Sequence, residues 1–348
     1  LASAYEPFAN AMGYTLNVTV PEDPALVAKI GATPEAKVEV APVVAVEPAP
    51  VAEPAPAPVA EAAPVMAEPM GLPYGVQEIV KNDDGASVFD LFIVHTNDLL
   101  GNIYSENGGL GLARLSTALK AGRAITDNWL LLNSGDVGEI PAEAAMLAAE
   151  VVDELGYDAY TPQAVQLATG VAGTQKALPL SVNVLDEDGY LVMQPYQVYN
   201  YNGFKVGVVG LVGPKDIQGV SFMSDLVVEN AQYAVDLAKE MVDYLVVLSD
   251  LGDGEVSSSL VASSVDGIDL IVDGNGSASA RSVNGTLIVR ADQMLRSIGG
   301  VQVSVADGEV VGVYPMLLPA ADVLDPASSA LASAYEPFAN AMGYTLNV

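Results

Sequence analysis

The stretch VFDLFIVHT, residues 88–96, decides the fold class of this chain. It is a short apolar run that ends in polar residues, and the pattern returns in NWLLLNSGD, residues 128–136. Such runs are typical of buried parallel strands. Between them lies LARLSTALKAGRAI, residues 112–125, which has the apolar spacing of a helix. The order strand, helix, strand predicts an α/β fold.

The alternation continues towards the C-terminus. Further strands are predicted for FKVGVVGLV (204–212), DYLVVLSD (243–250) and GIDLIVDG (267–274), and further helices for PAEAAMLAAEVVDELG (141–156) and NAQYAVDLAKEMVDYL (230–245). NGTLIVRAD (284–292) and GGVQVSVADGEVVGV (299–313) carry Asn-Gly or Asp-Gly turns and predict antiparallel hairpins. DPASSALASAYEPFANAMG (325–343) predicts a final helix, with Asp325 as its N-cap.

A proline-rich tract separates this region from the N-terminus. Between residues 33 and 70 the chain consists mainly of Pro, Ala, Val and Glu, and proline recurs every few residues. Proline fixes φ and biases the preceding residue towards extended geometry, so the tract predicts an extended spacer arm.

Composition excludes several classes of partner and site. Thirteen Lys and Arg residues stand against 44 Asp and Glu, which gives a formal charge of −31. This charge repels phosphate backbones and anionic membranes, so we expect no nucleic-acid partner and no membrane insertion. Cysteine is absent, which excludes disulfides, thiolate metal ligands and a cysteine nucleophile.

The order of short motifs resembles the 5'-nucleotidase branch of the calcineurin-like metallophosphoesterases. The matching segments are HTND (95–98), GGLGLARL (108–115), LLLNSGD (130–136), ELGYDAYT (154–161), LSVNV (180–184), NGFKVGVVGLV (202–212), VVLSDLG (246–252) and GIDLIVDGNGS (267–277). The resemblance implies a four-layer αββα sandwich with its site at the strand ends. It also implies a two-metal centre that activates water and clamps phosphoryl oxygens.

Most of the ligands implied by this resemblance are replaced. Two acidic positions are kept, at Asp98 and Asp136. The positions at which the family has its remaining ligands and catalytic imidazole carry Leu100, Ala164, Val165, Asp250, Asn275 and Ser277. The sole histidine, His95, matches a position that binds no metal in the family, and we expect it to be a structural imidazole in a buried strand. We therefore interpret the domain as a pseudoenzyme that needs no cofactor.

The sequence leaves undecided whether the chain has a different, weaker metal site. Asp98, Asp136, Asp250 and Asn275, with Asp273 or Gln166, would form an all-oxygen cluster suited to Ca²⁺ or Mg²⁺. In the alternative interpretation these side chains only cap strand ends and hydrogen-bond the former pocket.

The same 18 residues, LASAYEPFANAMGYTLNV, occur at 1–18 and at 331–348. Either the chain is part of a tandem array of nearly identical units, or one joint segment of a polymer is represented twice. Both predict head-to-tail contact between copies. The apolar residues expected to make this contact are Leu1, Tyr5, Phe8, Tyr14, Leu16, Val18, Leu331, Tyr335, Phe338, Tyr344, Leu346 and Val348.

These patterns predict four regions and two candidate functions. The regions are a joint helix and strand (1–18), an extended linker arm (19–86), the degenerate phosphoesterase-like domain (87–325) and a C-terminal helix with a joint strand (326–348). The favoured hypothesis is a structural subunit or repeat of an extracellular or cell-surface filament, fibre or surface layer. The alternative is a secreted metal-dependent phosphoesterase with an oxygen-rich metal site.

Overall fold

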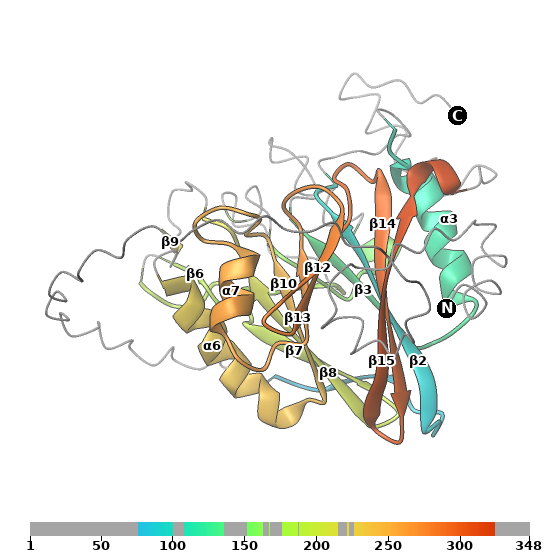
Figure 1. Ribbon diagram of the computed structural model, residues 1–348, viewed down its shortest axis with the longest axis horizontal. Coiled ribbons are helices and arrows are strands. Elements are labelled where there is room, and N and C mark those ends of the chain that lie inside the picture. The colour runs from blue at the N-terminus through green and yellow to red at the C-terminus, as the bar shows by residue number, and fades with distance from the viewer. Residues whose placement is uncertain are drawn as a thin grey trace, which may run out of the picture.

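Two β-sheets packed face to face form the centre of the molecule (Figure 1). The computed structural model describes residues 76–99, 108–135, 152–162, 167, 176–186, 188–214, 221–222 and 226–323. All structural statements below refer to these residues.

Sheet A is mixed and its central strands are parallel. Its described strands, in spatial order, are β1 (Ile79–Asn82), β7 (Tyr196–Tyr201), β8 (Phe204–Leu211), β10 (Tyr244–Ser249), β11 (Leu270–Asp273), β13 (Thr286–Arg290) and β12 (Ser279–Val283). Its outer face is covered by α6 (Val227–Ala238) and α7 (Ser258–Ser264), on the left in Figure 1.

Sheet B joins a long hairpin to parallel strands. Its described strands, in spatial order, are β15 (Glu309–Pro319), β14 (Ser297–Ala306), β2 (Val88–Asn97), β3 (Trp129–Ser134), β4 (Ala159–Tyr160) and β5 (Leu178–Pro179). The helix α3 (Gly111–Arg123) covers its outer face, on the right in Figure 1. Smaller elements are the pair β6 (Val184–Leu185) and β9 (Ser221–Phe222), and the 3-10 turns η2 (Lys239–Met241) and η3 (Ala320–Asp322).

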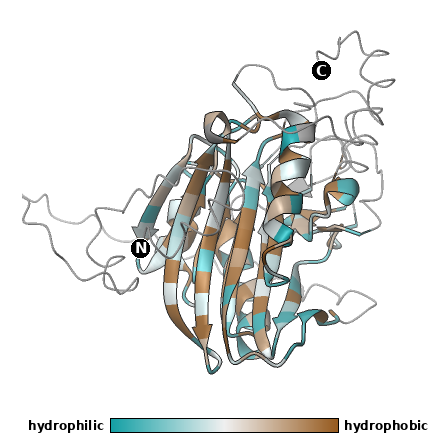
Figure 2. Ribbon diagram, turned by 90° about the vertical axis from the view of Figure 1, so that its right-hand side faces the viewer, coloured by the Kyte–Doolittle hydropathy of each residue, from teal (hydrophilic) through white to brown (hydrophobic). Residues whose placement is uncertain are grey.

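The strand β2 shows why the layers form. Leu91 and Ile93 face the other sheet, whereas Phe92 and Val94 face α3. Successive side chains of a strand point to opposite faces, so an uninterrupted apolar run fills two cores at once. Each fully buried side chain of this kind contributes about 1.5–3 kcal/mol. Figure 2 shows the resulting brown colour along the strands of this sheet.

The four-layer αββα sandwich and most predicted elements are confirmed. The buried strands of VFDLFIVHT and NWLLLNSGD are β2 and β3, and both C-terminal hairpins form at the Asn284-Gly285 and Asp307-Gly308 turns. The predicted helix over residues 112–125 is α3, which begins one residue earlier and ends at Arg123.

Two predictions differ from the structure. The helix predicted for 230–245 starts at Val227 and ends at Ala238, followed by η2, because Tyr244 already begins the fully buried strand β10. The arm predicted for 19–86 contains β1, which pairs in parallel with β7 and so belongs to sheet A. Short edge strands carry little sequence signal, which explains the missed strand. Most of the helix predicted for 141–156 and the whole final helix lie outside the described residues.

Candidate functional site at the strand ends

The carboxyl ends of the parallel strands in both sheets meet at one edge of the sandwich, which we call the strand-end edge. It comprises the described residues that follow β2, β3, β10, β11 and β13: 98–99, 135, 250–257, 274–278 and 291–296. Ser134 Oγ donates to the carbonyl of Ser249, and a Cβ added to Gly274 would lie 2.4 Å from the carbonyl carbon of Ser134. The two sheets are therefore in close contact at this edge.

Asn97 is a second link between the sheets. Its side-chain nitrogen donates to the carbonyls of Asp273, at 2.7 Å, and Ala291, at 3.1 Å. Its side-chain oxygen lies 3.2 Å from Nδ1 of His95 and accepts from that nitrogen when it carries the proton. The oxygen and the nitrogen of this buried amide thus both have partners within the fold, as burial of a polar group requires.

Asp98, the first predicted metal ligand, lies at this edge and is buried. Its Oδ2 accepts a 2.7 Å hydrogen bond from Nε2 of Gln293, and its carbonyl accepts from the N–H of Met294 at 2.9 Å. A Cβ on Gly135, whose φ is +86°, would lie only 2.0 Å from Oδ1 of Asp98. Glycine at 135 therefore lets the chain take a left-handed turn and pass close to this carboxylate.

The other described candidate ligands differ in burial. Asp250 is buried after β10, and its N–H donates to the carbonyl of Leu211 at 3.0 Å. Asn275 and Ser277 are exposed beyond β11. Asp136, Leu100, Ala164, Val165 and Gln166 lie outside the described residues, as do all the predicted assembly residues in 1–18 and 331–348.

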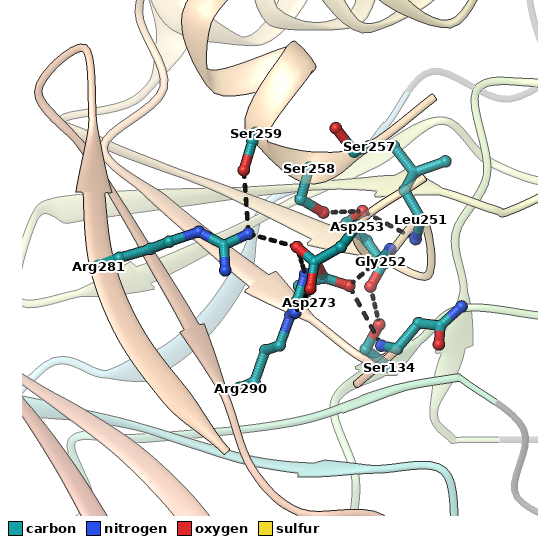
Figure 3. Close-up of polar contacts among 12 residues, drawn as sticks. Ser134, Leu251, Gly252, Asp253, Ser257, Ser258, Ser259, Asp273, Arg281 and Arg290 are labelled. Atoms are coloured by element: carbon teal, nitrogen blue, oxygen red, sulfur yellow. Dashed lines mark hydrogen bonds and ion pairs between the residues drawn. The ribbon is translucent and has the colours of Figure 1, made fainter. Parts of the chain in front are cut away.

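Asp273, one option of the predicted oxygen cluster, has hydrogen-bond partners on both carboxylate oxygens. Its Oδ1 accepts from the N–H groups of Gly252 and Asn275, both at 3.1 Å. Its Oδ2 accepts from Nε and Nη2 of Arg290, at 3.0 and 2.6 Å (Figure 3). The carboxylate is completely buried, and its negative charge is balanced by a guanidinium of the same chain.

Arg290 also binds a second carboxylate. Its Nη1 and Nη2 donate to Oδ2 and Oδ1 of Asp253, at 2.5 and 2.8 Å. Arg281 donates from Nη2 to Asp253, at 2.8 Å, and to Oγ of Ser259, at 2.9 Å. The hydrogen bonds from Arg290 hold the pKa of the Asp253 carboxyl well below its usual range, with Arg281 adding to the effect. Burial works against ionisation of Arg290, but its carboxylate partners leave its pKa raised overall.

This network was not predicted from the sequence. The available signal was a charged residue at the end of an otherwise apolar run, TLIVR, residues 286–290. A charge at such a position requires a buried partner, but the pattern does not identify it.

His95 is structural, as expected. It is 1% exposed, and burial lowers its pKa to about 4. It faces Gly299 of β14, where an added Cβ would lie 2.2 Å from the imidazole ring. At neutral pH it is an uncharged side chain packed between strands.

The described residues do not fit the two-metal centre that the resemblance implies. Such a centre requires several carboxylates and imidazoles converging on two cations. The chain has one histidine, His95, and it is buried inside the sheets. Among the described residues, no three His, Cys, Asp or Glu side chains group closely enough to hold a metal ion. Asp98 and Asp273 instead accept hydrogen bonds from neighbouring groups of the fold.

No helix in the described part of the chain has the length and apolar character needed to cross a membrane.

Comparisons with protein-family models and with curated protein sequences gave no match.

Comparison with solved structures found similar folds. A calcineurin-like phosphoesterase, YfkN, from Bacillus subtilis aligns with a TM-score of 0.60 at 20% identity, over 73% of this chain and 98% of that one. A 5'-nucleotidase precursor from Thermus thermophilus aligns with a TM-score of 0.59 at 23% identity, over 73% of this chain and 59% of that one. A putative 5'-nucleotidase from Staphylococcus aureus aligns with a TM-score of 0.56 at 16% identity, over 72% and 58%.

The chain thus spans about three fifths of the length of these two 5'-nucleotidases. Taken with the ordered motifs, the alignments show that the described domain has the fold of the calcineurin-like phosphoesterases and 5'-nucleotidases.

Proposed function

We propose that this domain uses the phosphoesterase fold without two-metal phosphoester hydrolysis. The observation that carries the proposal is the position of His95, the only imidazole in the chain, which is buried between strands with a pKa of about 4. This sequence has no second histidine that could bind a metal ion or protonate a leaving group. Fold similarity alone does not supply that chemistry.

A second candidate function is hydrolysis or binding of a phosphate ester through an oxygen-rich cation site. Asp98, Asp136, Asp250 and Asn275 would provide its ligands, and Ca²⁺ or Mg²⁺ would be the suitable ions. The comparisons support this candidate more than a filament role, because the similar structures carry the names of phosphoesterases and 5'-nucleotidases.

A structural role in an extracellular filament or surface layer rests on a different observation. The 18 identical residues at 1–18 and 331–348 would place the same joint at two points of the chain, and copies of this chain would be its partners. Electron microscopy of the purified chain tests this role: regular fibres support it, and uniformly monomeric particles contradict it.

Hydrolysis assays test the main proposal. The full chain is incubated with AMP or bis(p-nitrophenyl) phosphate and with Mn²⁺, Co²⁺ or Ca²⁺, beside a double variant Asp98→Ala, Asp250→Ala. We expect both proteins to show the rate of the metal ion alone. Turnover by the unmodified chain that disappears in the variant would overturn the proposal and establish the oxygen-rich site.

A further inference from the structure

The buried carboxylate of Asp273 needs a compensating positive charge. It lies at the carboxyl end of β11 and is completely inaccessible to solvent. An isolated ionised carboxylate in such a place is strongly unfavourable unless it is paired and hydrogen-bonded. In a two-metal centre at the strand ends, cations would carry the positive charge; here a side chain of β13 carries it.

Arg290 provides this positive charge, and all three nitrogens of its guanidinium donate hydrogen bonds to carboxylates. Its side chain is 3% exposed and donates to Asp273 on one side and to Asp253 on the other. Paired donation to both oxygens of Asp253 is the strongest geometry available to arginine and carboxylate. Asp253 itself is 61% exposed, so the network leads from the sheet interior to the surface.

The surrounding backbone is shaped for this guanidinium. Gly276 has φ of +132°, and a Cβ at this position would lie 2.8 Å from Nη1 of Arg290. Gly276 lies between Asn275 and Ser277, the two positions at which the resemblance places the last metal-binding imidazoles. The guanidinium therefore lies against the segment from which a metal ion would otherwise be bound.

We propose that Arg290 is a built-in cation that replaces a metal ion as the source of positive charge at the strand-end edge. It ties together β11, β13 and the loop after β10, and Arg281 on β12 balances the remaining charge of Asp253. The two guanidiniums and two carboxylates of this network sum to zero charge, so these four side chains need no divalent cation to balance them.

Thermal unfolding of the full chain, with and without excess EDTA or added Mn²⁺, tests this proposal. We expect the midpoint of the unmodified chain to be unchanged by either addition. Arg290→Met should lower it by about 10 °C, because a buried carboxylate loses its partner. Arg281→Met, which removes a partly exposed arginine of the same network, is the matched control and should lower it much less.

A second variant covers the case in which Arg290→Met does not fold. In Asp273→Asn, Arg290→Met both buried charges are removed, and we expect this protein to fold and to have a higher midpoint than Arg290→Met. A large drop of the unmodified chain in EDTA, or equal effects of the two arginine variants, would overturn the proposal. These outcomes are read from stability and are separate from the hydrolysis assays, so either proposal can fail alone.

Discussion

Two clusters near the strand ends, one in each sheet, bury polar groups in different ways. In sheet A, Arg290 forms ion pairs with Asp273 and Asp253, which we call the charged half. In and beside sheet B lies a neutral cluster, Thr96, Asn133 and Tyr157, which we call the neutral half and which does not include the buried carboxylate of Asp98. Thr96 Oγ1 donates to Oδ1 of Asn133 at 2.8 Å, and it lies 2.6 Å from the hydroxyl of Tyr157.

Because of this difference, we expect substitutions in the two clusters to change the free energy of unfolding by different amounts. Removing one partner of a buried ion pair leaves a charge without compensation, whereas removing a neutral hydrogen-bonding group leaves only an unsatisfied dipole. The charged half should therefore respond much more strongly to single substitutions. Sheet B also holds the one imidazole, His95, through which we expect stability to depend on pH.

The largest effect is expected for Asp273→Ala. This change leaves the buried Arg290 with only the exposed Asp253 and also removes the acceptor of two backbone N–H groups. We expect a loss of about 3–5 kcal/mol in the free energy of unfolding, measured by urea denaturation. A loss below that of the neutral variant Thr96→Val would remove the contrast between the two halves.

Protonation of His95 should have the next largest effect. Burial lowers its pKa in the folded chain from 6.5 to about 4, so the unfolded chain binds this proton more tightly. Its contribution to stability is complete above pH 6.5 and is lost as the pH falls towards 4, by about 3 kcal/mol in total.

The measurement is the free energy of unfolding between pH 7 and pH 4 for the unmodified chain and for His95→Asn. Subtracting the two profiles removes the contribution of the carboxylates. Parallel profiles would show that His95 does not titrate differently in the two states.

Thr96→Val tests the neutral half directly. Valine keeps the shape of threonine but removes the hydroxyl that contacts Asn133 and Tyr157. We expect a cost of about 1–3 kcal/mol by urea denaturation, with no change in the pH profile. A variant as unstable as Asp273→Ala would contradict the ranking.

Much of the fold could be predicted from the sequence, but the charged half of the edge could not. The apolar runs around residues 91–94 and 245–248 encode strands buried on both faces, because each side chain position in them is apolar. The ordered motifs also placed Asp98 at the strand-end edge. The partners of Arg290 come from other segments, and no local pattern shows which carboxylates a buried guanidinium will reach.

The smallest effect is expected for Asp253→Asn. Most of this side chain is in solvent, and Arg290 keeps its bonds to Asp273. We expect a loss of about 1 kcal/mol or less, measured by urea denaturation and reduced further by salt. The pKa of this carboxyl is lowered in the folded chain, so its contribution is present above the ordinary pKa of 3.8 and is lost only in more acidic solution.

The number of metal ions bound per chain tests the central claim most directly. The purified chain is equilibrated with Mn²⁺, dialysed against metal-free buffer and analysed for metal by mass spectrometry. The account predicts that no pair of ions is retained, because the only imidazole is buried and Arg290 supplies the positive charge at the end of sheet A. Retention of two Mn²⁺ ions per chain, with their loss in Asp98→Ala, would contradict it.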